Sequence, residues 1–167
     1  MPVPRPTIEE FQKHYPATGE IGREDLFKSI GWDSEIDNSA FLNTCAIRAS
    51  IGLIGCRVPV KGRMKILKGE FKNKLIEPGQ HYLSLFLRDY WGQPEKFKTN
   101  ELYKLAGRCG VISFFDISPG TPIRQGHIDV LDPTPQKLFN CASYCQWKSA
   151  ETWFWELPRA TSSRPRT

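Results

Sequence analysis

The spacing of apolar residues changes once along the chain, near residue 110, and this change limits the folds that are possible. Upstream, apolar side chains recur about three or four residues apart, which is typical of amphipathic helices. We expect helices over residues 22–32, 43–55, 79–92 and 99–110. Downstream, we expect strands over residues 110–117, 126–132, 137–145 and 151–158, the third breaking into a loop. Helices followed by a meander of antiparallel strands predict an α+β fold.

The chain length of 167 residues suits one domain of ordinary size. We expect that domain to span residues 1–158. Four prolines among the first sixteen residues disfavour an early helix, so residues 1–20 are expected to be loosely ordered. Residues 57–78 are basic and interrupted and predict a loop with short strands, and residues 159–167 predict a disordered tail.

The net charge of +5 and the isoelectric point near 9.0 favour an anionic partner, such as nucleic acid, a membrane surface or the bacterial cell wall. The first residues lack the apolar stretch of a signal peptide, and no apolar run approaches the roughly 18 residues of a spanning helix. We therefore expect synthesis in the cytoplasm and no membrane insertion. The five cysteines contain neither a CxxC nor a CxxH pair, so no metal site is predicted, and their odd number leaves at least one thiol unpaired.

Cys45 stands at the start of a predicted helix, in the motif NTCAIRAS at residues 43–50. The helix dipole and the free N–H groups of the first turn favour a thiolate there. The backbone N–H of Cys45 and the side chain of Asn43 are the expected donors to an oxyanion. Arg48, one turn later, is expected either to meet a substrate carboxylate or to pair with Asp129. The alternative for Cys45 is a small buried residue with a purely structural role.

His127 is the best candidate for the base that a thiolate nucleophile requires. Of the other histidines, His14 lies in the proline-rich start and His81 at the head of a helix, and both are expected to be exposed or structural. His127 opens a short strand in which Asp129 and Leu131 share its face. A cysteine on a helix that meets a histidine on a strand is the arrangement of papain-like enzymes.

The histidine also needs a partner that orients its second ring nitrogen. Asn140 lies about one strand length after the turn at residues 133–135, where an antiparallel neighbour would bring it beside His127. Asp129 is the rival candidate, because it shares the face of the strand with His127, although its side chain points parallel to the ring. Asp132 begins the turn and is the weakest of these candidates.

Several motifs occur in order along the chain: NTCAIRAS, LRDYWGQP, GRCGVISF, GHIDVLD, a two-cysteine segment and a closing WFWELP. In this combination the chain resembles the fourth family of type VI secretion amidase effectors, which are NlpC-type, papain-like peptidoglycan amidases. The resemblance runs over roughly residues 25–157, and its most specific parts are the N-x-C-A-I-R and G-H-I-D motifs. It implies a papain-like NlpC-type fold, in which N-terminal helices pack on an antiparallel sheet.

The resemblance implies an antibacterial cysteine amidase that cuts the bond between γ-D-glutamate and meso-diaminopimelate in wall peptides, without a metal or an organic cofactor. The family's nucleophile corresponds to Cys45 and its base to His127. Its third residue is an aspartate on the strand after the histidine, and there the sequence departs, because QKLFNC offers Asn140 and no aspartate. Asparagine orients the histidine in papain itself, so Asn140 stays the first candidate and Asp129 the rival.

The implied partners are peptidoglycan, the type VI secretion machinery and a cognate immunity protein that plugs the cleft, with no role for nucleic acid. The protein would be made in the cytoplasm without a signal peptide and would act in the periplasm of the target bacterium. That oxidising compartment favours a disulfide between Cys141 and Cys145, and the alternative is two reduced, buried thiols. Cys56 and Cys109 are expected to be free.

Two other functions stay open on the residues alone. A cysteine acyltransferase of the transglutaminase type uses the same dyad of Cys45 and His127 with an amine as the acceptor. A non-catalytic basic module that binds the cell wall or nucleic acid explains the charge and the aromatic residues, but it gives no reason for the dyad.

Overall fold

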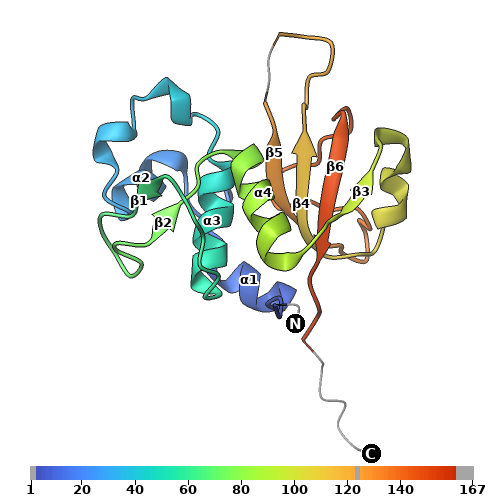
Figure 1. Cartoon of the computed structure of the whole chain (residues 1–167), viewed down its shortest axis with the longest axis horizontal. Helices are drawn as coiled ribbons and strands as arrows, with labels where there is room; N and C mark the ends of the chain where they lie inside the picture. Colours follow the sequence, from blue (N-terminus) through green and yellow to red (C-terminus); the bar gives the residue numbers. More distant parts are fainter. Residues whose placement is uncertain (1–2, 123–124, 161–167) are drawn as a thin grey trace, which may run out of the picture.

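The computed structural model describes residues 3–122 and 125–160 of the chain (Figure 1). Its α-helices are α1 (Ile8–His14), α2 (Arg23–Ser29), α3 (Cys45–Gly55) and α4 (Gln80–Trp91). Short 3-10 helices are η1 (Asp33–Glu35), η2 (Ser39–Phe41) and η3 (Thr99–Leu105). The strands are β1 (Met64–Lys65), β2 (Leu75–Ile76), β3 (Glu95–Phe97), β4 (Gly110–Phe115), β5 (His127–Leu131) and β6 (Glu151–Glu156). Helices come first and most strands follow, which confirms the α+β prediction.

The main sheet is antiparallel and has the strand order β3-β6-β4-β5, so β5 lies at an edge. In the pairing of β4 with β5, Phe114 stands opposite His127 and Ile112 opposite Asp129. β1 and β2 form a separate small ribbon within the loop region that follows α3. Because β5 is an edge strand, one side of His127 and Asp129 is left for a segment outside the sheet to cover.

α3 is the most deeply buried helix of the described chain, and every residue from Cys45 to Ile54 is buried. It contacts α1, α4 and β5, and Figure 1 shows α3 and α4 next to the half of the sheet that holds β5 and β4. The small side chains of Ala46 and Ala49 allow this close packing from several sides. Among the described residues, no helix has the length and apolar content needed to cross a bilayer.

The prediction that residues 1–20 are loosely ordered is wrong for α1. Thr7 follows the third of the early prolines and caps the helix, since its Oγ1 accepts a hydrogen bond from the Glu10 amide at 3.1 Å. Ile8 and Phe11 are fully buried and anchor the helix to the core. The prolines before Thr7 therefore do not prevent the helix, which begins directly after this cap. Of the predicted tail, residues 161–167 lie outside the described residues.

Two further segments differ from the prediction. Residues 99–105 form the 3-10 helix η3 and not an α-helix; Leu102 and Leu105 are buried, and Ala106 is exposed. The segment 137–145 forms no strand, and its β-type pairing with β5 is one isolated β-bridge between Leu131 and Cys141.

A substitution at Gly110 tests how closely β4 and β6 approach each other. A Cβ at this position would lie 2.1 Å from the carbonyl oxygen of Trp155, a backbone atom that cannot move without opening the strand pair. We expect Gly110→Ala to lower the free energy of unfolding by about 1–3 kcal/mol in chemical denaturation.

Gly19→Ala is the matched control, because no atom lies within 4 Å of the added carbon. Its effect should stay within about 0.5 kcal/mol. Equal stability of the two variants would contradict the strand contact at Gly110.

Candidate active site

Cys45 and His127 meet where α3 packs against β5. Cys45 is the first residue of α3 and His127 the first residue of β5. Both side chains line one cavity of about 440 Å³, which also takes in the exposed side chains of Leu42 and Tyr144. The structure thus brings together the two residues that the sequence paired.

Cys45 also lines a second, neighbouring cavity of about 330 Å³, together with Gln80, His81 and Tyr82. Cys45 therefore lies between two cavities, an arrangement that suits an extended substrate crossing it. His81 lies closer to the site than the sequence suggested, and its ring contacts Tyr82 and Phe115 edge-on. His14 lines a different cavity, away from Cys45.

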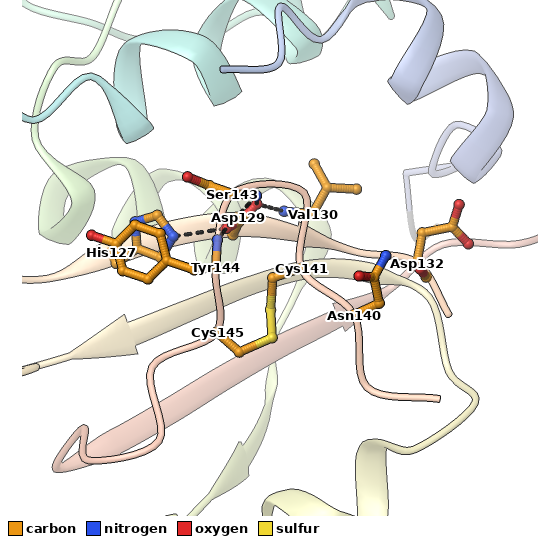
Figure 2. Close-up of a disulfide and its surroundings, with 9 residues drawn as sticks. All are labelled: His127, Asp129, Val130, Asp132, Asn140, Cys141, Ser143, Tyr144 and Cys145. Atoms are coloured by element: carbon orange, nitrogen blue, oxygen red, sulfur yellow. Dashed lines mark hydrogen bonds and ion pairs between the residues drawn. A yellow bond between two sulfur atoms is a disulfide. The ribbon is translucent and has the colours of Figure 1, made fainter. Parts of the chain in front are cut away.

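Asp129 holds the imidazole of His127. His127 Nε2 and Asp129 Oδ2 are 2.7 Å apart, and the carboxylate is 1% exposed (Figure 2). The same carboxylate accepts backbone N–H groups from Val130 at 2.7 Å and from Ser143 and Tyr144 at 3.2 Å. These donors compensate its burial and fix the direction in which it meets the ring.

The predicted position of Asn140 beside His127 is wrong. Asn140 Nδ2 donates to the carbonyl of Asp132 at 2.9 Å, at the far end of β5 (Figure 2). The chain turns back directly after the strand and pairs Cys141 with Leu131. In an antiparallel return of this register, the residues opposite His127 come after Cys141 and not before it.

A disulfide joins Cys141 to Cys145 and closes the loop that covers Asp129, with the two Cα atoms 5.4 Å apart. Ser143 and Tyr144, which donate their amides to Asp129, lie inside this closed loop. Among the described residues, the free cysteines are Cys45, Cys56 and Cys109.

Two aromatic rings stack nearly parallel to the His127 imidazole. Phe114, opposite in β4, has its ring centroid 6.1 Å from that of His127 and its plane 10° from parallel. Tyr144 stacks at 5.0 Å and 11°, although Tyr144 itself is 60% exposed (Figure 2). The ring of His127 therefore has little freedom to rotate, and its π-stacked environment suits the protonated form.

The environment of His127 raises its pKa to about 9. Burial lowers the pKa, but the hydrogen bonds to Asp129 and to Cys45, and the negative charges of both groups, outweigh it. Because Nε2 faces Asp129, the other ring nitrogen, Nδ1, is the one left for the sulfur. At neutral pH the histidine therefore holds its proton.

Asn43 links the two halves of the site instead of leaving two free oxyanion donors. Its Oδ1 accepts the backbone N–H of Cys45 at 3.0 Å, and its Nδ2 donates to the carbonyl of Gly126 at 3.2 Å. Both of the predicted oxyanion donors are thus engaged in the free protein. The amide bridge ties the start of α3 to the residue before His127.

Gln80 supports the same junction from α4 and was not predicted. Its Nε2 donates to Ser113 Oγ at 2.7 Å, and its side chain lies against Gly126, where a Cβ would fall 1.8 Å from Oε1. Ser143 and Tyr144 were also missed, because they act through backbone amides and a ring face. The spacing of Cys141 and Cys145 was the sequence signal for a tight loop there. The described residues contain no group of three or more His, Cys, Asp or Glu residues that could hold a metal ion.

Comparison with known proteins gives a family and a fold. Residues 41–155 match the profile of the family described as type VI secretion system (T6SS), amidase effector protein 4. The structure is similar to the type VI effector Tae4 from Enterobacter cloacae, with 21% identity and a TM-score of 0.75 over 94% of this chain and 99% of that one. No curated protein sequence is significantly similar.

Solved complexes give the same fold. The effector–immunity complex Tae4–Tai4 from Enterobacter cloacae matches with 20% identity and a TM-score of 0.71, over 92% of this chain and 99% of that one. The Tae4–Tai4 complex from Salmonella Typhimurium matches with 20% identity and a TM-score of 0.66, over 92% and 99%. These likenesses confirm the predicted papain-like, NlpC-type fold.

The pairing of His127 with Asp129 predicts a pH dependence of stability. The folded-state pKa of about 9 exceeds the ordinary value of 6.5, so this pair stabilises the fold fully below pH 6.5, and the stabilisation is lost as the pH rises through 9. We expect NMR titration to give a His127 pKa near 9, and Asp129→Asn to lower it and to flatten the fall in unfolding free energy over this range.

Asn140→Ala is the matched control for this titration, because Asn140 contacts Asp132 and not His127. It should leave the His127 pKa unchanged. If Asn140→Ala lowers that pKa while Asp129→Asn does not, the orienting role belongs to Asn140.

Tyr144→Ala should leave the imidazole uncovered and slow the alkylation of Cys45 by iodoacetamide at neutral pH severalfold, because a ring contact of this kind contributes about 0.5–1.5 kcal/mol. Tyr144→Phe keeps the stacked ring and should react like the unaltered protein. The modified peptide is measured by mass spectrometry, which separates Cys45 from Cys56 and Cys109. Equal slowing by both variants would assign the effect to the hydroxyl.

Proposed function

Because the chain belongs to the family of type VI secretion system amidase effector protein 4, we propose that Cys45, His127 and Asp129 carry out its amide hydrolysis. The protein is an antibacterial peptidoglycan amidase of the type VI secretion system. The observation that carries the residue assignment is the 2.7 Å contact between His127 Nε2 and Asp129, beside a helix-start cysteine in one cavity.

The proposed substrate bond is the amide between the γ-carboxyl group of D-glutamate and meso-diaminopimelate in wall peptides. Two cavities that meet at Cys45 suit a peptide with residues on both sides of the scissile bond. The net charge of +5 suits the anionic wall polymer that carries these peptides.

In the first step the Cys45 thiolate attacks the γ-glutamyl carbonyl carbon, a C–S bond forms, and the carbonyl electrons move to oxygen. The backbone amide of Cys45 would donate to that oxygen, which would replace Asn43 Oδ1 as its acceptor. When the C–N bond breaks, the imidazolium of His127 gives its Nδ1 proton to the leaving amine of diaminopimelate.

In the second step the neutral imidazole removes a proton from water. The resulting hydroxide attacks the thioester carbon, the C–S bond breaks, and the products are a free γ-carboxyl group, the Cys45 thiolate and the imidazolium of His127. Asp129 stays in place throughout and stabilises the charged ring. The residues in the site account for each proton without a cofactor.

The proposal extends to partners and compartment. The Tae4 effectors of Enterobacter cloacae and Salmonella Typhimurium are found in complexes with the immunity protein Tai4. We infer that this chain, likewise, is neutralised by a cognate immunity protein that covers the cleft around Cys45. The protein would be made in the cytoplasm, passed to the type VI apparatus, and active in the periplasm of the target bacterium.

Digestion of purified peptidoglycan tests the assignment. Cys45→Ala should lower the release of new diaminopimelate amines by about a thousandfold or more, because the nucleophile is lost. Asp129→Ala should lower it by about a hundredfold or more, and Asn140→Ala by no more than about threefold, since of these two residues Asp129 contacts the ring and Asn140 does not.

Mass analysis of the products separates the other functions. Crosslinked or amine-tagged peptides would identify a transferase, and an unchanged wall with Cys45 intact would identify a binding module. Full activity of a folded Cys45→Ala protein would overturn the mechanism.

A further inference from the structure

The mechanism leaves one buried charge in the cleft unused, the guanidinium of Arg48. Arg48 lies one turn after Cys45 on α3, is 2% exposed, and lines the same cavity. Its Nε donates to Thr44 Oγ1 at 2.9 Å, and its Nη1 donates to the carbonyls of Pro16 and Ile21 at 2.9 and 2.7 Å. These neutral acceptors orient the guanidinium but do not neutralise it.

No carboxylate of the described residues forms an ion pair with Arg48, so the predicted pairing with Asp129 does not occur. Within residues 3–122 and 125–160, Nη2 of Arg48 also has no hydrogen-bond partner. Burial lowers the pKa of Arg48, which reflects the unfavourable environment of an uncompensated cation. An anion that entered the cavity would relieve that cost.

Tyr15 adds a second donor to the same wall of the cavity. Its side chain is 5% exposed and lines the cavity with Arg48, and its hydroxyl has no hydrogen-bond partner among the described residues. Burial and the negative charges of Asp129 and Cys45 raise the pKa of Tyr15 far above its ordinary value. The hydroxyl therefore stays protonated at any working pH and can donate a hydrogen bond.

We propose that Arg48 and Tyr15 form a carboxylate subsite that binds the free α-carboxylate of the γ-linked glutamyl residue. This inference rests on the proposed function, because only a γ-linked glutamyl substrate presents that group. In such a substrate the side-chain carboxyl forms the scissile amide, and the α-carboxylate stays ionised.

The position of Arg48 relative to Cys45 fits this substrate. Residues three apart on a helix have Cβ atoms about 5–6 Å apart and lie on one face. A glutamyl residue attached through its γ-carbonyl places its α-carboxylate a short aliphatic chain away from the sulfur. The planar guanidinium pairs with a carboxylate more specifically than an ammonium group does, because its N–H groups match both oxygens.

The test compares two synthetic peptides that differ only at this carboxyl group: L-alanyl-γ-D-glutamyl-meso-diaminopimelate and the same peptide with D-isoglutamine, in which the α-carboxylate is an amide. The unaltered protein should cleave the free acid with a kcat/KM roughly ten- to a hundredfold higher, because one charge-assisted contact is lost with the amide. Equal cleavage of both peptides overturns the subsite and leaves the proposed function standing. If neither peptide is cleaved, the proposed function fails, and the inference falls with it.

Variants of Arg48 and Tyr15 test whether these residues cause the preference for the free-acid peptide. Arg48→Gln should bring the ratio of the two kcat/KM values close to one, Arg48→Lys should leave it intermediate, and Tyr15→Phe should reduce it. Arg88→Gln is the matched control, because Arg88 on α4 pairs with Asp89 and lines neither cavity at Cys45. An undiminished preference in a folded Arg48→Gln protein would assign the selectivity to another group.

Arg48 also holds the carbonyls of Pro16 and Ile21, so its variants can lose stability. A crystal structure of Cys45→Ala with the free-acid peptide avoids this difficulty, since Arg48 stays intact. The α-carboxylate should lie within hydrogen-bonding distance of the Arg48 guanidinium and the Tyr15 hydroxyl. A carboxylate directed into the cavity of Gln80 and Tyr82 would overturn the assignment.

Discussion

The buried carboxylate of Asp129 is the interaction on which the rest of the site depends. A carboxylate that is 1% exposed must have its oxygens compensated, and the structure supplies the His127 ring and three backbone amides. Two of those amides come from the loop after β5, so the loop must fold back over the strand. That folding also lays Tyr144 on the imidazole. One buried charge thus organises an edge strand, a loop and a ring.

The site is also a junction between the two parts of the fold. Cys45 belongs to the helices and His127 to the sheet, and their separation depends on how α3 packs on β5. Asn43 and Gln80 reinforce this junction by contacts with Gly126, the residue before the histidine. Asn43 and Gln80 therefore help to set the geometry between Cys45 and His127. The same junction buries Arg48, whose charge the described protein leaves without an anionic partner.

Local sequence patterns were sufficient to predict much of this fold. They could not predict the register between segments that lie far apart in the chain. The helix at Cys45 and the strand at His127 were readable because apolar periodicity and glycine boundaries are local signals. Asn140 was misplaced because its neighbour depends on where the chain turns after Leu131, and the observed bridge to Cys141 shifts the return. The role of Ser143 could not be predicted for another reason: it acts through its backbone amide, and every non-proline residue has the same group. Pro2, Pro4 and Pro6 predict a loosely ordered start, but they precede the Thr7 cap, so α1 forms directly after them.

Because of the disulfide between Cys141 and Cys145, the covalent closure of the loop over Asp129 depends on the redox conditions around the protein. Such bonds persist in oxidising compartments and are reduced where thiol buffers dominate. A newly made chain in a reducing compartment carries two thiols at this place, and chain entropy then favours the opening of the loop that supplies the Ser143 and Tyr144 amides. Oxidation closes that loop covalently. The assembly of the site is thereby coupled to the redox state of the protein's surroundings.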